Sequence, residues 1–409
     1  MNSSVVRLAV VASGAALLAA ACSSSGHNAA LPSGAGTTAA TTIAIGGAGP
    51  LHNPAYNEPT LLTGLQAAVD SINAAGGVKG HKLKLDFCDT GYTVNGELSC
   101  AHQFVSEQVA AAVDPYFLAD QSGAEVQLLQ QAGIPIFGGQ GLSPTELNNP
   151  DAYPLSSGLP GWTYGAVASL LRAGAKKISI LVDTNPGSQF AGQLLAAAAK
   201  SAGITAPVVT GDPNADPTFA AAAAKATANG KNGVALFPSP VNVPKMIKAL
   251  RQTGFQGKIS LPTVILPAVF INALGAAGNG VLADSQVALT TDTSNPGVRQ
   301  YLADMKKYGH NQVTDASIFA WSAVQLFAKA IAGGSSFDAK GITAALSSLS
   351  TPVDINTVAP WHAAGVTSPL ATFRRILNPT VTYGVVKNGQ LVTAGGGFVN
   401  PFTQLSANH

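Results

Sequence analysis

Hydrophobic positions follow two alternating patterns from residue 42 onward. Short apolar runs indicate β-strands, and stretches in which apolar residues recur every three or four positions indicate helices. The first helix places Leu61, Leu65, Val69 and Ile72 on one face. Strands are predicted at residues 43–45, 82–87, 134–137, 177–182, near 208, and at 234–237, 258–261 and 281–288. Further helices are predicted at residues 104–109, 125–132, 161–173, 190–201, 217–228, 243–253, 296–308, 316–332 and 338–349.

This alternation favours an α/β fold. Apolar strands separated by helices are typical of parallel sheets that helices cover on both faces. More than eight strand–helix units exceed one ordinary sheet, so we expect two α/β lobes. The tail differs, because residues 372–377 and 381–386 are both strand-like. The sequence Lys387-Asn388-Gly389-Gln390 then predicts a type I′ hairpin turn.

The N-terminus has the pattern of an export signal. Arg7 precedes an apolar run that ends at Ala21 and is too short for a membrane span of roughly 20 residues. Cys22 follows three alanines and resembles the lipidated cysteine of bacterial lipoproteins, although the usual leucine lies one place early, at Leu18. We therefore expect a signal peptide at residues 1–21, a lipidated flexible tether at 22–41, and an extracytoplasmic protein anchored to the cell membrane. Ordinary cleavage, with Cys22 incidental, is the alternative.

Composition excludes several classes of partner. Charged residues make up only 10% of the chain, with 22 basic against 20 acidic residues, and no Lys/Arg cluster is longer than a pair. This balance gives no electrostatic basis for binding nucleic acid. No second apolar run is long enough to span a bilayer, so contact with the membrane is expected through the lipid anchor only.

Catalytic and metal-binding motifs are missing from the sequence. The seven histidines are scattered without zinc-binding spacing, and neither a GxSxG elbow nor a P-loop occurs. Gly47-Ala48-Gly49 begins like a dinucleotide fingerprint, but Pro50 and His52 follow where a helix should start. We therefore expect no enzyme, no cofactor and no metal. An amide hydrolase that uses Asp and Ser residues, and a structural envelope protein with a degenerate cleft, are the rival interpretations.

Two cysteines remain once Cys22 carries lipid. Cys88 and Cys100 are twelve residues apart in an exported chain, where oxidation is favoured. A metal site would need more ligands than these two thiols. We expect a disulfide bond that stabilises the fold by about 3 kcal/mol on a chain-entropy estimate.

The loops that follow the strands are the candidate binding elements. In open α/β sheets, ligands bind beyond the carboxyl ends of the strands. These loops are rich in Gly, Ser, Asn, Gln and Pro, which suit a small polar ligand held by hydrogen bonds. They span residues 46–57, 114–123, 138–143, 183–189, 238–242 and 262–266.

Several stretches resemble the type 1 periplasmic binding proteins, in particular the leucine/isoleucine/valine-binding branch. The most specific is residues 64–80, GLQAAVDSINAAGGVKG, and others lie at 82–85, 132–136, 143–147, 174–181 and 320–325. The resemblance implies two doubly wound parallel-sheet lobes joined by a three-segment hinge. Lobe 1 would hold residues 42–157 and a returning segment at 288–369, and lobe 2 would hold 158–287 and the C-terminal strands and tail at 370–409.

The resemblance also implies a function. A lipid-tethered member of this branch binds an amino acid or similar small polar solute as a monomer and delivers it to the permease subunits of an ABC importer. A sensing module of the same fold, which reports to a membrane partner, is the alternative.

Family ligand positions map onto the loops of lobe 1 with departures. Ala119 stands where the family has a carboxylate-binding serine, and its neighbours Asp120, Gln121 and Ser122 are candidates for contact, Ser122 being the nearest hydroxyl. The second loop supplies a further set of candidates, which are Gly139, Gln140, Gly141 and Ser143. Tyr56 lies where an aromatic ring commonly covers the solute.

Lobe 2 departs further from the family pattern. Thr263 replaces the acid that pairs with the ammonium, while Phe190, Phe237 and Ser239 would form the wall. A neutral threonine cannot neutralise a buried ammonium. The solute is therefore expected to be less zwitterionic, for example an amide, unless Asp120 supplies the acid, in which case Asp120→Asn would abolish binding.

Overall fold

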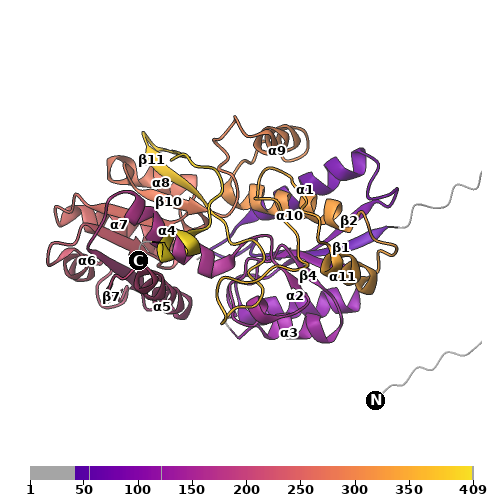
Figure 1. The fold of residues 1–409 in the computed structure, drawn as a ribbon, viewed down its shortest axis with the longest axis horizontal. Helices are drawn as coiled ribbons and strands as arrows, with labels where there is room; N and C mark the ends of the chain where they lie inside the picture. The colour runs from indigo at the N-terminus through magenta and orange to yellow at the C-terminus, as the bar shows by residue number, and fades with distance from the viewer. Residues whose placement is uncertain (1–41, 55, 121, 408–409) are drawn as a thin grey trace, which may run out of the picture. The chain divides into compact units, whose positions relative to one another are not determined.

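The computed structural model describes residues 42–54, 56–120 and 122–407. The predicted signal peptide, Cys22, the tether and Gln121 lie outside these residues. Two sheets with helices around them form the two predicted lobes (Figure 1). No helix in the described part of the chain is long and apolar enough to cross a membrane.

The first sheet has the strand order β2-β1-β3-β4-β5, and all of its pairs are parallel. Its strands are β1 (Ile43–Gly49), β2 (Leu83–Asp89), β3 (Ala111–Pro115), β4 (Ile136–Phe137) and β5 (Ala152–Tyr153). Every residue of β3 is buried, as expected for a strand covered on both faces.

The second sheet repeats this order and extends it. Its strands are β6 (Ile178–Asp183), β7 (Val208–Gly211), β8 (Gly233–Leu236), β9 (Lys258–Pro262), β10 (Leu282–Ser285), β11 (Thr382–Lys387) and β12 (Gln390–Thr393). The order β7-β6-β8-β9-β10 matches that of the first sheet, and β11 and β12 add an antiparallel edge. The predicted hairpin turn is confirmed, because Asn388 and Gly389 both have positive φ, at 51° and 75°.

The helices are α1 (Pro59–Ala74), α2 (Val94–Ser106), α3 (Ala124–Gln131), α4 (Gly158–Arg172), α5 (Pro186–Ser201), α6 (Ala220–Thr227), α7 (Val243–Gln252), α8 (Ala268–Leu274), α9 (Pro296–Lys307), α10 (Asp315–Ile331), α11 (Ala339–Ser348) and α12 (Pro401–Ser406). Helix α10 packs against α1 and β3, although it is far from both in sequence (Figure 1). Gly64 allows this approach, since a Cβ there would overlap the backbone of Ser317. Helix α4 packs on β8, β9 and β10 of the second sheet.

Some predicted elements differ from those observed. Residues 372–377 form no strand. Phe373, Ile376 and Leu377 are buried, but the Arg375 N–H donates to the carbonyl of Leu147 and not to a neighbouring strand. Helix α2 begins ten residues before the predicted segment, since the Thr93 hydroxyl caps its N-terminus. Helices α8 and α12 were not predicted, because both are shorter than two full turns of apolar periodicity.

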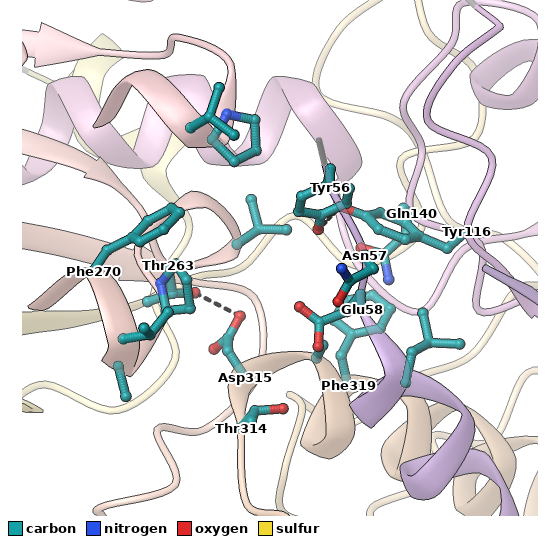
Figure 2. A pocket seen from close by; sticks show the side chains of 18 of the residues that line it. Tyr56, Asn57, Glu58, Tyr116, Gln140, Thr263, Phe270, Thr314, Asp315 and Phe319 are labelled. Atoms are coloured by element: carbon teal, nitrogen blue, oxygen red, sulfur yellow. Dashed lines mark hydrogen bonds between the residues drawn. The ribbon is translucent and has the colours of Figure 1, made fainter. Parts of the chain in front are cut away.

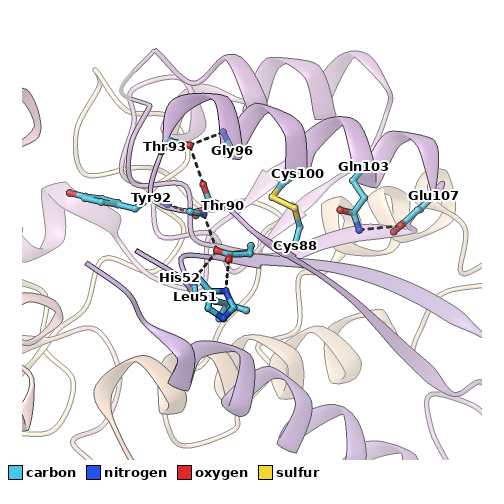
Figure 3. The surroundings of a disulfide bond; sticks show 12 residues. Leu51, His52, Cys88, Thr90, Tyr92, Thr93, Gly96, Cys100, Gln103 and Glu107 are labelled. Atoms are coloured by element: carbon cyan, nitrogen blue, oxygen red, sulfur yellow. Dashed lines mark hydrogen bonds and ion pairs between the residues drawn. A yellow bond between two sulfur atoms is a disulfide. The ribbon is translucent and has the colours of Figure 1, made fainter. Parts of the chain in front are cut away.

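The predicted disulfide between Cys88 and Cys100 is present, with an S–S distance of 2.01 Å (Figure 3). It joins the end of β2 to α2 and closes a loop whose cross-linking stabilises the fold by about 3 kcal/mol. Beside it, the Asp89 carboxylate accepts hydrogen bonds from Leu51 N and Gly91 N and contacts Nδ1 of His52 at 2.8 Å. This network fixes the loop after β1 next to the loop that carries Tyr92.

Candidate functional site

Two adjacent cavities lie where loops from the carboxyl ends of both sheets meet. Cavity 1 has a volume of about 410 Å³ and cavity 2 about 280 Å³. They share four lining residues, Tyr116, Trp162, Pro240 and Val264. Each of the six loops singled out in the sequence contributes at least one lining residue. The combined space is of the size that binds a small organic ligand.

Five aromatic side chains form what we call the aromatic wall of cavity 1. They are Tyr56, Tyr116, Trp162, Phe270 and Phe319. The hydroxyls of Tyr56 and Tyr116 lie 3.2 Å apart, and burial raises the pKa of both above the usual value for tyrosine. Both phenols therefore stay neutral at physiological pH and present apolar ring surface to the cavity.

Two carboxyl groups face the same part of cavity 1, Glu58 immediately before α1 and Asp315 at the first position of α10 (Figure 2). Thr263 Oγ1 donates a hydrogen bond to Asp315 Oδ2 at 3.0 Å. Burial raises the pKa of Asp315 to about 6, and the nearby charge of Glu58 adds to the increase. Burial also raises the pKa of Glu58, although the Thr60 hydroxyl donates to it and partly offsets the effect.

Cavity 2 is lined by the loops after β3, β6 and β8. Leu118 and Ala119 form one side, and Phe237 with Ser239 and Ser188 forms the opposite side. Asn185, which caps the N-terminus of α5 through Gly187 N, also lines this cavity. Its polar groups are neutral.

A carboxylate of the protein itself, Glu97, accepts hydrogen bonds from the backbone amides of the loop after β3. The N–H groups of Leu118, Ala119 and Asp120 donate to Glu97 at 2.5, 2.7 and 2.8 Å. The Glu97 side chain extends from α2 and is fully buried. Its burial raises the pKa, although the three amide donors act in the opposite direction. These amides are therefore already paired with an anion from the protein itself.

Three other loops are arranged in the same way. Glu146 accepts from Gly141 N at 3.0 Å and from Leu142 N at 3.3 Å. In the second sheet, Asp183 accepts from Asn185 N at 3.2 Å and from Ser239 N at 2.8 Å. In the loops after β3, β4, β6 and β8, backbone amides therefore donate hydrogen bonds to carboxylates of the protein itself.

Six predicted contact residues line one of the two cavities. Tyr56, Gln140 and Thr263 line cavity 1, and Ala119, Phe237 and Ser239 line cavity 2. Six others line neither cavity, namely Asp120, Ser122, Gly139, Gly141, Ser143 and Phe190. For two of these residues, hydrogen bonds within their own loop hold the side chain away from the cavities. The Asp120 carboxylate accepts from Ser122 N, Ser122 Oγ and Ala124 N. Ser143 Oγ accepts from Glu146 N. Gln121 lies outside the described residues.

The acids of cavity 1 were missed from the sequence. Glu58 precedes Pro59 at a helix start, and Asp315 follows the capping residue Thr314, so both match ordinary helix N-terminal chemistry. Trp162 lies in a helix that is buried on all sides, which conceals its contribution to both cavities. The Thr263–Asp315 hydrogen bond places an acid beside the neutral threonine, and this acid comes from α10.

In the described part of the chain, no three His, Cys, Asp or Glu side chains cluster in a way that could hold a metal ion.

The profile of the periplasmic binding protein family matches residues 42–366. The chain belongs to this family. Periplasmic binding proteins bind solutes outside the cytoplasm and are not enzymes, so this periplasmic binding protein is extracytoplasmic and non-catalytic. The predicted family and fold class are confirmed.

Solved structures with the same fold include transport proteins with different solutes. A possible leucine/isoleucine/valine-binding protein from Rhodopirellula baltica is 19% identical, with a TM-score of 0.73 over 87% of this chain and 97% of the other. An ABC transporter solute-binding protein from R. palustris in complex with 4-hydroxybenzoate is 20% identical (TM-score 0.71; coverage 88% and 97%). A fatty acid ABC transporter substrate-binding protein from Thermomonospora curvata is 15% identical (0.72; 90% and 94%). The comparison with curated proteins found no significant match.

Proposed function

We propose that this periplasmic binding protein is the solute receptor of an ABC importer and that Cys22 tethers it to the cell membrane by lipid. The observation that carries this proposal is the pair of adjacent cavities where the loops of the two sheets meet. Two solved structures of the same fold are named as solute- or substrate-binding proteins of ABC transporters, and a third as a possible leucine/isoleucine/valine-binding protein. These names support the assignment to import.

Closure of the cleft would use the three connections between the sheets. The chain passes between them after β5, after β10 and between α11 and β11. We propose that lobe 1 comprises residues 42–157 and 288–369, that lobe 2 comprises 158–287 and 370–409, and that these connections form the hinge. Residues from both lobes then enclose the solute when the hinge closes.

A cognate solute is expected to raise the melting temperature of the purified protein. At 100 times its Kd, a solute stabilises by about 2.7 kcal/mol, which corresponds to an increase of about 3–4 °C for a folded chain of this length. Thermal-shift measurement across a library of small metabolites tests this. Ala316→Trp, which fills cavity 1, should remove the shift, whereas Ala224→Trp on the exposed face of α6 should keep it. A library without any stabilising solute would contradict the assignment.

Lipidation of Cys22 is expected to hold the protein in the membrane fraction. Fractionation of cells that express the full chain should find it with membranes, and mass spectrometry should find acyl chains on the N-terminal cysteine. Cys22→Ser should release the protein into the soluble fraction. Recovery of unmodified wild-type protein in the soluble fraction would contradict the tether and leave solute binding unaffected.

A further inference from the structure

The charges in the cleft all have one sign. Glu58 and Asp315 contribute two carboxyl groups to cavity 1, and their side chains point into the same space (Figure 2). Among the described residues that line cavity 1 or cavity 2, none is Lys, Arg or His. A carboxylate ligand would therefore meet two acids and no compensating cation.

Backbone donors do not supply that compensation. At the strand ends of the first sheet, an amino acid's carboxylate would need free amides or hydroxyls, yet Glu97 occupies the amides of Leu118 to Asp120. Glu146 occupies those of Gly141 and Leu142. Ala119 has no hydroxyl, and that of Ser143 is turned to Glu146 N.

An independent feature of cavity 1 also points to a ligand that donates hydrogen bonds. Gln140 is only 5% exposed, and its side chain reaches cavity 1 beside Tyr116 (Figure 2). Its Nε2 donates to Asp114 Oδ1 at 3.0 Å, whereas its Oε1 has no hydrogen-bond partner in the protein. A buried carbonyl oxygen without a donor is costly, so a ligand N–H or O–H at this position would be favoured.

We propose that the cleft binds a solute with a protonated amine and no carboxylate, the ammonium lying between Glu58 and Asp315 and a hydrophobic body against the aromatic wall. The inference rests on the proposed function and names its solute class. Glu58 and Asp315, which come from different elements, neutralise the ammonium charge that the neutral Thr263 cannot. The aromatic rings contact the hydrophobic body of the solute and add cation–π attraction to the ammonium.

Protonation of the acids gives this binding mode a pH signature. The charge of Glu58 raises the pKa of Asp315, and the charge of Asp315 in turn raises the pKa values of Asp284 and Tyr301. None of these three neighbours is a basic group. The pKa of Asp315 in the solute-free protein is raised to about 6 by burial. An ammonium binds the ionised form, so affinity should fall by about tenfold from pH 7.5 to pH 5.

Matched pairs of compounds test the solute class by titration calorimetry at pH 7.5. 2-Phenylethylamine is compared with phenylalanine and 3-phenylpropionate, and 3-methylbutylamine is compared with leucine. We expect at least one amine to bind at least thirtyfold more tightly than its carboxylate-bearing partners. Equal or tighter binding of the amino acids or of 3-phenylpropionate would overturn the inference, as would the failure of both amines to bind.

Variants locate the site of that preference. Asp315→Asn and Glu58→Gln keep the side-chain shape and should each weaken amine binding by about thirtyfold, and Asp315→Asn should also flatten the pH dependence. Glu107→Gln, an exposed change at the end of α2, should change neither. Unchanged affinity in both cavity variants would overturn the proposal. The metabolite library tests the proposed function separately, since a stabilising carboxylate solute would preserve that function while excluding this solute class.

Discussion

Glu97→Ala is expected to lower the free energy of unfolding by about 4 kcal/mol. The substitution leaves the N–H groups of Leu118, Ala119 and Asp120 without their acceptor. Each unpaired buried amide costs about 1–3 kcal/mol, and water that enters the vacated space offsets part of the total. Urea unfolding of the wild-type protein and the variant measures the difference.

Acetate is expected to restore part of this loss. Alanine retains the Cβ of Glu97, so the missing atoms match acetate, and the three amides remain arranged around a carboxylate. With a Kd of about 10 mM, 100 mM acetate would return about 1.4 kcal/mol. Chloride at equal ionic strength serves as the control, and the wild-type protein should not respond to acetate. A variant as stable as the wild type, or one that acetate does not stabilise, would contradict the role of Glu97 as an internal anion.

Raising the pH from 5 to 7.5 is expected to lower the free energy of unfolding by at least about 2 kcal/mol. Burial raises the pKa of Glu146 from 4.5 to about 7, despite the hydrogen bonds from Gly141 and Leu142. In this interval the native state binds more protons than the unfolded chain, so stability is greatest below pH 4.5 and is lost as pH rises through 7. Asp315, with a pKa of about 6, and Glu125, with a pKa of about 8, act in the same direction.

Glu146→Gln isolates the contribution of Glu146 to this dependence. Glutamine resembles the protonated carboxyl group and does not titrate, so the variant should lose about 2 kcal/mol of the pH-dependent change. The exposed substitution Glu107→Gln should retain the wild-type profile. Denaturant unfolding at half-unit intervals of pH measures both. A wild-type profile that is flat or rises between pH 5 and 7.5 would contradict the raised pKa of Glu146.

Local sequence patterns were sufficient where one element decides the outcome. The hairpin turn follows from Asn388 and Gly389, which tolerate positive φ, and the pairing of Cys88 with Cys100 follows from the scarcity of other cysteines. The strand predicted at residues 372–377 was wrong, because the apolar residues Phe373, Ile376 and Leu377 indicate burial but do not specify an extended backbone. Periodicity identifies which residues are inside, and it leaves the partner of each backbone group undetermined.

The candidate site needed information from several elements at once. The loops at the strand ends could be listed from the sequence, because parallel strands direct their carboxyl ends to one edge. Which groups remain open to a solute could not, because Glu97 and the amides it occupies are more than 20 residues apart. Asp120 is a comparable case, since its carboxylate pairs with its own loop.

The amino-acid sequence by itself determined the two α/β lobes, the disulfide, the family and the loops around the cleft, since each depends on short-range periodicity, composition or motif. Only the tertiary structure decided the charge of the cleft. Glu58 and Asp315 are 257 positions apart and face one cavity because α10 returns to pack on α1. Electrostatic energy depends on distance in space, and no pattern along the chain records that distance.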